Sequence, residues 1–189
     1  LKDKLLLVNN NPYQDIWINK RLTGNKNISG EFEKRFGYRP VLQPEIDMIF
    51  RTHDNKLNAI EVKYLRDKNS FSYYLGIGQA LALKRFGFDH VGLWLLLDEN
   101  IPKSEENRYG SSAWSLIRDD LGMKLEYTYF KVSRKQGKLS FAVMNYKGDG
   151  KGFELVPNVE GDDFLISWKY QNEIKGFEKP AFMRQLIEK

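Results

Sequence analysis

The sequence contains no cysteine and only two histidines among its 189 residues. Without cysteine there is no disulfide framework, thiolate metal site or cysteine nucleophile, and a reducing, intracellular (cytoplasmic) location is favoured. His53 falls in an expected turn and His90 just before an expected strand, and neither has the spacing of a metal site or the context of a serine hydrolase. Thiol chemistry is therefore excluded, and imidazole chemistry is not favoured.

Long hydrophobic runs are also missing. The longest dense apolar run, residues 91–97, suits a buried strand and is far shorter than the roughly 18 apolar residues that a membrane-spanning helix needs. No internal repeat or linker-like stretch interrupts the chain, so we expect a single domain over residues 1–189, with an α/β core at 1–99 and a β-rich extension at 100–189. The formal net charge of +5 is compatible with a polyanionic partner.

The first forty residues carry helix signals after a short apolar run at residues 5–8. Asn11 followed by Pro12 is typical of an N-cap and a first helical position, and predicts a helix that continues towards Leu22. A second short helix is expected over residues 29–36, ended by a left-handed glycine immediately after it.

The next sixty residues predict a hairpin followed by a crossover. Residues 46–51 and 58–65 have the composition of two strands, and the polar segment 53–56 between them predicts a turn. Residues 72–86 have helical apolar spacing and lead into the run at 91–97. A strand, a helix and a strand in this order predict a parallel crossover.

The second half changes style near residue 100. We expect a polar loop at residues 102–112 and a short helix that ends near Leu121. Turn signals then separate stretches of β-type alternation. The expected strands cover residues 124–132, 139–146, 153–156 and 164–170, and a last helix begins at Pro180.

Two glycine-rich segments do not form nucleotide-binding motifs. Gly76-Ile77-Gly78 begins like the dinucleotide fingerprint, but Leu81 stands at its third glycine position and no strand precedes it. The segment Gly148–Gly152 lacks both the spacing and the following Ser or Thr of a phosphate-binding loop, so a tight turn is the better interpretation.

The chemistry-bearing pattern is Asp47 on the first hairpin strand with Glu61 and Lys63 on the second. Side chains two apart on a strand share a face, and hairpin pairing brings the carboxylate of Asp47 alongside that of Glu61. Three other acid-x-lysine pairs occur, but they lie in expected turns or polar stretches. Two close carboxylates repel unless a cation sits between them, and carboxylates with water suit Mg²⁺ or Mn²⁺.

From about Ser29 to Leu97, the sequence resembles the PD-(D/E)XK nuclease superfamily. Ile46-Asp47-Met48-Ile49 matches the apolar strand around the first Asp, and Ala59-Ile60-Glu61-Val62-Lys63 matches the second motif closely. The resemblance implies a restriction-endonuclease-like α/β core, in which helices flank a central mixed β-sheet. The β-rich C-terminal half of the chain has no counterpart in this resemblance. The resemblance also implies a Mg²⁺- or Mn²⁺-dependent deoxyribonuclease, in which water attack leaves a 5′-phosphate.

Further roles follow from this resemblance alone. Gly30-Glu31-Phe32-Glu33 resembles the helix start in modification-dependent restriction endonucleases, which gives Glu33 the role of a further metal-site acid, with Glu31 as its rival. Gln79 is similar to the helix glutamine of Holliday-junction resolvases, where it would help to place the lysine or a phosphate. In one departure, Pro44 stands three residues before Asp47, and Glu45 competes as a ligand.

DNA is the expected partner, and basic residues are the candidates to bind it: Arg66, Lys68, Lys84 and Arg85. Their role depends on convergence on one face, which the sequence does not reveal. By analogy with superfamily members that cut both strands, a homodimer is an expectation. Two alternatives stay open, namely a catalytically inactive nucleic-acid-binding module on the same scaffold and a structural or partner-binding protein whose acid pair is incidental.

Overall fold

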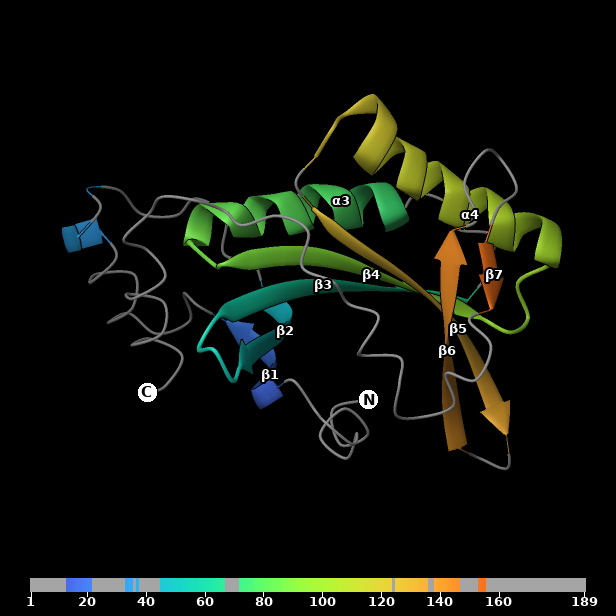
Figure 1. Cartoon of the computed structure of the whole chain (residues 1–189), viewed down its shortest axis with the longest axis horizontal. Helices are drawn as coiled ribbons and strands as arrows, with labels where there is room; N and C mark the ends of the chain where they lie inside the picture. The colour runs from blue at the N-terminus through green and yellow to red at the C-terminus, as the bar shows by residue number, and fades with distance from the viewer. Residues whose placement is uncertain are drawn as a thin grey trace.

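The computed structural model describes residues 13–21, 33–35, 37, 45–66, 72–123, 125–135, 138–146 and 153–155. Seven strands form one sheet in which every strand pairs with its neighbours in the chain (Figure 1). The strands are β1 (Tyr13–Arg21), β2 (Glu45–Thr52), β3 (Leu57–Leu65), β4 (His90–Asp98), β5 (Glu126–Lys135), β6 (Lys138–Tyr146) and β7 (Phe153–Leu155). Both halves of the sequence therefore contribute to one α/β fold.

The sheet is mixed, with a parallel centre. β3, β4 and β5 run parallel, whereas β1 to β3 and β5 to β7 pair in antiparallel fashion. Parallel neighbours need crossover connections, and helices supply them. Helix α3 (Ser72–Leu83), continued by the 3₁₀ turn η1 (Lys84–Phe86), joins β3 to β4, and α4 (Lys103–Ser115), continued by the π-helical turn η2 (Leu116–Asp120), joins β4 to β5. Both helices lie on the same side of the sheet (Figure 1).

The hairpin predicted from the sequence is confirmed. β2 and β3 pair in antiparallel register, from Met48 opposite Ile60 to Arg51 opposite Leu57. In the turn, Asn55 has a positive φ of 62°, and the N–H of Thr52 donates to the carbonyl of Lys56 at 3.0 Å. The predicted crossover from residues 58–65 through a helix to residues 91–97 is confirmed as well.

The helix predicted from Asn11 to Leu22 is wrong, because residues 13–21 form strand β1. This segment is rich in aromatic and β-branched residues, and pairing with β2 buries Tyr13 and Ile16. An ion pair between Asp15 and Arg51 also links the two strands, with Arg51 Nε 2.7 Å from Asp15 Oδ2. Long-range pairing has therefore overridden the local Asn-Pro capping signal.

The polar loop predicted at residues 102–112 is also wrong, because α4 occupies residues 103–115. The carbonyl of Pro102 accepts the N–H groups of Glu105 and Glu106 at 2.8 and 3.0 Å, and acidic residues in a first turn suit the helix dipole. Tyr109 and Ala113 of α4 and Ile117 of η2 are buried four residues apart, which gives a narrow apolar stripe that half-buried Trp114 and Leu116 extend.

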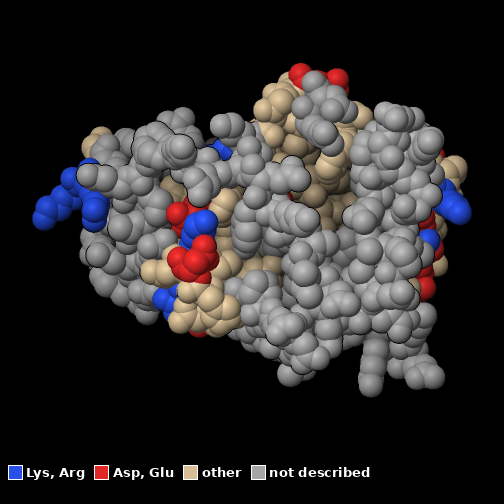
Figure 2. Space-filling view, in the orientation of Figure 1, with Lys and Arg blue, Asp and Glu red and all other residues tan. Residues whose placement is uncertain are grey.

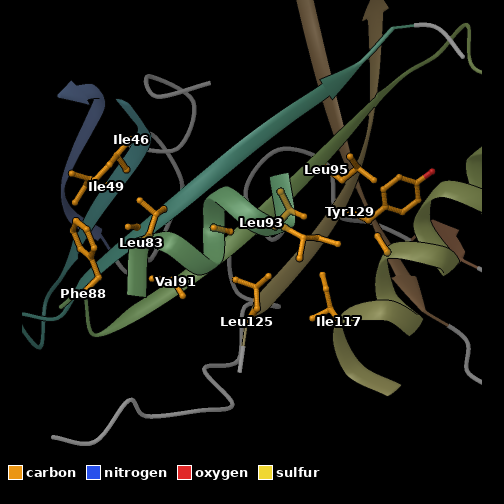
Figure 3. Close-up of a cluster of buried hydrophobic side chains, with 14 of the residues drawn as sticks. Ile46, Ile49, Leu83, Phe88, Val91, Leu93, Leu95, Ile117, Leu125 and Tyr129 are labelled. Carbon is orange, nitrogen blue, oxygen red and sulfur yellow. The ribbon is translucent and has the colours of Figure 1, made fainter. Parts of the chain in front are cut away.

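The hydrophobic core has two parts, one on each face of the sheet. The part beneath the helices includes residues of the sheet, of α3 and of η2, such as Leu93, Leu83 and Ile117 (Figure 3). The part on the opposite face is aromatic-rich, with Phe50 and Phe130 flanking Trp94 at centroid distances of 5.5 and 5.1 Å. Burial on both faces explains why β4 reads as a continuous apolar run.

Some predictions concern residues that lie wholly or partly outside the described ranges. These are the apolar run at 5–8, most of the helix at 29–36, the strand at 164–170 and the helix from Pro180. Within the second of these, residues 33–35 are helical and Gly37 has a φ of 74°, as expected for a left-handed stop. In the ranges that the structure describes, no helix is both long enough and apolar enough to cross a membrane.

Candidate metal and lysine site

Asp47 lies where the hairpin ladder between β2 and β3 ends. The pairing stops at Met48 opposite Ile60, one step before Asp47 would face Glu61. At this point the side chain of Asp47 replaces the ladder, because the backbone N–H of Val62 donates to its Oδ2 at 2.7 Å. The hydrogen bond fixes the Asp47 carboxylate beside β3 and next to Glu61.

Glu61 and Lys63 lie two residues apart on β3 and form an ion pair. Lys63 Nζ is 2.5 Å from Glu61 Oε1, and the exposed fractions of the two side chains are 21% and 2%. Burial raises the pKa of the Glu61 carboxyl, and the negative charge of Asp47 raises it further, while the hydrogen bond and charge of Lys63 act in the opposite direction. The two carboxylates and the ammonium therefore form one interacting group on the helix-covered face of the sheet.

The second carboxylate oxygen of Glu61 is buried and lacks a partner. Among the residues that the structure describes, Oε2 accepts no hydrogen bond. A buried acceptor left without a partner costs about 1–3 kcal/mol. A hard cation would satisfy this oxygen, and one or two carboxylates completed by water molecules are the ligand set that Mg²⁺ prefers. Asp47 and Glu61 therefore fit Mg²⁺ or Mn²⁺.

Helix α3 crosses directly over the lysine, and a glycine permits the close approach. A Cβ built at Gly76 would lie 2.7 Å from Cγ of Lys63 and 2.9 Å from Cδ1 of Leu93. Real Cβ atoms essentially never approach other heavy atoms this closely. The aliphatic stem of Lys63 thus packs against the backbone of α3 at Gly76, and its ammonium lies beside Glu61.

The structure does not bring the other expected acids into this group. Glu45 lies on the same strand as Asp47, but its Oε2 is 2.7 Å from Nε of Arg21 across the β1–β2 pairing. Glu33 is half-buried in the helical turn at 33–35. No cluster of three or more potential metal-ligating acids or histidines occurs within the described ranges, so Asp47 and Glu61 form a two-carboxylate site there. Glu31, the rival of Glu33, lies outside those ranges.

Gln79 lies one turn beyond Gly76 on α3. Its side chain is exposed, on the flank of the helix, whereas Ile77 and Ala80 face the core. Among the described residues, no hydrogen bond joins its side chain to that of Lys63 or Glu61. Gln79 therefore lies on the same helix as Gly76, but its side chain does not contact the site.

The expected DNA-binding basic residues lie at two ends of the crossover. Arg66 follows the carboxyl end of β3, whereas Lys84 and Arg85 are in η1, close to the amino end of the same strand. A hydrogen bond joins the segment after η1 to the start of β3, since the N–H of Leu57 donates to Oδ2 of Asp89 at 2.7 Å. A nine-residue strand separates these ends by about 30 Å, so the residues do not form one compact patch. Lys68 lies outside the described ranges.

The visible surface charge follows the same pattern. Figure 2 shows one face of the molecule, on which charged atoms of described residues form small groups, including one in which acidic and basic atoms lie side by side. On the described part of this face, positive charge does not extend into a broad single-sign surface.

Sequence reasoning missed three features of the structure. The first is the role of Gly76, for which a glycine inside an apolar helix was the only signal. The second is Glu126 at the start of β5, where burial raises the pKa to about 9; an acid beside apolar Leu125 was the available signal. The third is a pocket at the carboxyl ends of the parallel strands, which no local pattern indicates.

Comparison with known proteins yields one structural neighbour with weak similarity. No protein-family model and no curated protein matches the chain. Among solved structures, SfsA from Pyrococcus furiosus, determined in complex with Ca²⁺, aligns with a TM-score of 0.34 and 11% sequence identity. The alignment covers 74% of this chain and 55% of SfsA, so the chain spans about half the length of that protein.

Proposed function

We propose that the chain is a Mg²⁺- or Mn²⁺-dependent DNA nuclease that hydrolyses phosphodiester bonds by water attack. In this proposal Asp47 and Glu61 hold the metal ion, and Lys63 orients the attacking water. The observation that carries it is the buried Glu61 carboxylate, whose Oε2 has no partner in the described ranges while Oε1 lies 2.5 Å from the lysine. A bound cation is one explanation for a buried carboxylate oxygen without a partner, and the adjacent Asp47 carboxylate favours it here.

The arrangement suits phosphodiester hydrolysis, which needs neither cysteine nor histidine. When bound, the metal ion would activate a water molecule and neutralise charge that develops on the phosphate oxygens. The protein's own contribution is to hold the groups around the reacting atoms. Asp47 is fixed by the N–H of Val62, and Glu61 is fixed by burial and by Lys63. The site is thus preorganised, which limits the reorganisation needed during the reaction.

Lys63 is suited to act on the nucleophile or on the phosphate. Its stem is clamped under Gly76 and its side chain keeps 21% of its surface exposed, so the ammonium is directed yet reachable. A positive charge at this position would orient a water molecule or compensate the phosphate charge in the transition state. Glu33 and Gln79 stay outside the core of this proposal, because the described contacts do not join them to the site.

Within this proposal, the chain is a divergent member of the PD-(D/E)XK superfamily with a restriction-endonuclease-like core. The support is the order of elements around the site: an acid on β2, Glu-x-Lys on β3, then α3 and β4. β3 and β4 are parallel and α3 lies over the lysine, so one crossover unit carries Glu61 and Lys63, and the neighbouring strand β2 supplies Asp47. The homodimer remains a prediction from the same analogy.

A nucleic-acid-binding module without catalytic activity is the second candidate. Two observations favour it. Only two carboxylates form the site within the described ranges. Lys63 contacts Glu61 directly, so the lysine itself supplies a counter-charge to the buried acid. In that case the ion pair would be the structural substitute for a metal ion. DNA binding that is salt-sensitive and metal-independent, without cleavage of any substrate, would indicate this function.

The test is cleavage of supercoiled, linear, flap and four-way DNA in Mg²⁺ or Mn²⁺ by the native chain, Asp47→Asn and Lys63→Met. We expect each substitution to lower the cleavage rate by about 100-fold or more. Glu45→Gln is the matched control, because Glu45 lies on the same strand but pairs with Arg21, and it should cleave close to the native rate.

A thermal-shift measurement with the same variants separates metal binding from chemistry. The native chain and Glu45→Gln should gain stability when Mg²⁺ or Mn²⁺ is added, whereas Asp47→Asn should not, because only a ligand that binds the folded state raises the melting temperature. Full cleavage by both Asp47→Asn and Lys63→Met would refute the site assignment.

A further inference from the structure

A pocket of about 270 Å³ lies at the edge of the sheet where the parallel strands end. β3, β4 and β5 run in the same direction, so their carboxyl ends meet at one edge. The described residues that line the pocket come from these ends and from the turn after β4: Arg66, Asp98, Glu99, Asn100 and Arg134. The carboxyl edge of parallel strands is a common place for ligands in α/β folds.

This pocket is distinct from the carboxylate and lysine site. Tyr64, whose side chain reaches the pocket residue Asp98, belongs to the core on the sheet face opposite the helices. Lys63 and Glu61 point to the helix-covered face, where Lys63 meets Gly76 of α3. Alternation along β3 therefore directs the two sets of side chains to opposite sides of the sheet.

The two carboxylates of the pocket accept hydrogen bonds from other groups of the protein. Asp98 Oδ1 accepts the backbone N–H of Asn100 at 3.1 Å and its side-chain amide at 2.6 Å, while Oδ2 accepts the hydroxyl of Tyr64. The Tyr64 hydrogen bond is the main reason that the pKa of Asp98 lies below its ordinary value. Glu99 Oε1 accepts the backbone N–H of Arg134 at 2.9 Å.

Among the described residues, the guanidinium groups of Arg66 and Arg134 make no comparable hydrogen bonds. Arg66 is exposed and lies over the ring of Tyr64, with Cζ 5.0 Å from the ring centroid. Arg134 is exposed near the end of β5, and its backbone rather than its side chain makes the hydrogen bond to Glu99. Among the described residues, neither guanidinium lies within ion-pair distance of a carboxylate, although the charge of Arg134 helps to lower the pKa of Asp98. A guanidinium that stacks on an aromatic ring keeps its edge donors available for an anion.

We propose that this pocket binds a phosphate group between the guanidinium groups of Arg66 and Arg134. Both arginines line the pocket, and a guanidinium group is a planar, permanently charged donor that suits phosphate oxygens. Asp98 and Glu99 accept hydrogen bonds from Tyr64, Asn100 and Arg134, and these bonds fix the positions of the two carboxylates in the wall of the pocket. The phosphate is free inorganic phosphate, a terminal phosphate of a nucleic acid or a phosphate of its backbone, all of which present the same anionic oxygens. The inference does not depend on the proposed nuclease activity.

The test is calorimetric titration of inorganic phosphate into the full chain with EDTA present, so that the metal site is not involved. We expect binding by the native protein and an affinity at least tenfold weaker in Arg134→Gln and in Arg66→Gln, since each substitution removes a charge-assisted contact to the anion. Arg134→Gln keeps the backbone N–H that Glu99 accepts. Arg108→Gln on α4 is the control, because Arg108 is an exposed arginine outside the pocket, and its affinity should equal that of the native chain.

Two further arms identify the source of the phosphate. A short single-stranded oligonucleotide is titrated with and without a 5′-phosphate, again in EDTA. Tighter binding of the phosphorylated form that disappears in Arg134→Gln assigns the pocket to a terminal phosphate, and equal weakening of both forms assigns it to the backbone. Absence of phosphate binding by the native chain, or equal affinity of native protein and both pocket variants, would overturn the proposal. Circular dichroism of the variants distinguishes loss of binding from loss of folding.

Discussion

Alanine at position 76 would place a methyl group 2.7 Å from Cγ of Lys63 and 2.9 Å from Cδ1 of Leu93. Relief of this overlap requires a shift of the lysine stem, of a buried leucine or of α3 itself. Overpacking of this kind costs about 1–3 kcal/mol. Replacement of a helical glycine by alanine returns about 1 kcal/mol through helix propensity. We therefore expect Gly76→Ala to lower the free energy of unfolding by about 0–2 kcal/mol.

Gly78→Ala is the matched control for this prediction. Gly78 lies two residues further along the same helix, is exposed, and a Cβ at that position would meet no atom within 4 Å. Only the propensity gain remains, so this substitution should stabilise the protein by about 0.5–1 kcal/mol. The two variants should therefore differ by about 1–3 kcal/mol, or by about 2–12 °C in melting temperature for a chain of this length.

Urea denaturation and thermal unfolding measure the difference directly. Under the proposed function, Gly76→Ala should also lower kcat for DNA cleavage more than it changes KM, because a displaced Lys63 acts on the reaction rather than on substrate binding. Gly78→Ala should leave both parameters unchanged. Equal stability of the two variants would refute the reasoning that α3 clamps the stem of Lys63.

Two further predictions concern ionisable groups in the sheet. Because burial raises the pKa of Glu126 from about 4.5 to about 9, its contribution to stability is present below pH 4.5 and is lost as pH rises towards 9. Glu126→Gln should therefore gain stability relative to the native chain as pH rises, by a few kcal/mol at pH 8. Chemical denaturation at pH 5, 6.5 and 8 tests this, and parallel curves would contradict it. Lys63→Met removes the hydrogen-bonding counter-charge of buried Glu61 and should destabilise the protein by about 1–3 kcal/mol at pH 8. The loss should shrink on acidification, because protonated Glu61 needs no counter-charge, and a pH-independent difference would argue against the coupling.

The hairpin and the crossover could be read from the sequence because their signals are local. Residues 46–51 and 58–65 alternate or run apolar around a polar turn, and residues 72–86 keep a helical period before the apolar run of β4. In these segments the local preference and the tertiary structure agree. The acid and lysine of β3 could be placed on one face for the same reason, since side-chain alternation is a property of the strand alone.

β1 and α4 could not be read in this way. The Asn-Pro signal before Tyr13 favours a helix locally, yet an exposed edge of β2 offers backbone hydrogen bonds and a buried surface that the isolated segment lacks. In α4, the apolar residues that pack into or against the core are Tyr109, Ala113 and Trp114, and the polar residues around them mask the helical period. In both segments the deciding interaction lies far away in the sequence.

The sequence by itself determined the chemistry that the chain has at its disposal: no thiol, few imidazoles, and an acid, an acid and a lysine on two adjacent strands. Only the tertiary structure decided how those groups are held. The end of the ladder at Met48 brings Asp47 to the N–H of Val62, and the approach of α3 at Gly76 clamps Lys63. Residue types are fixed by the chain, whereas burial and the spacing between strands arise only when distant segments pack together. The burial of Glu61 Oε2 without a partner and the placement of Arg66 and Arg134 in one pocket arise only on folding.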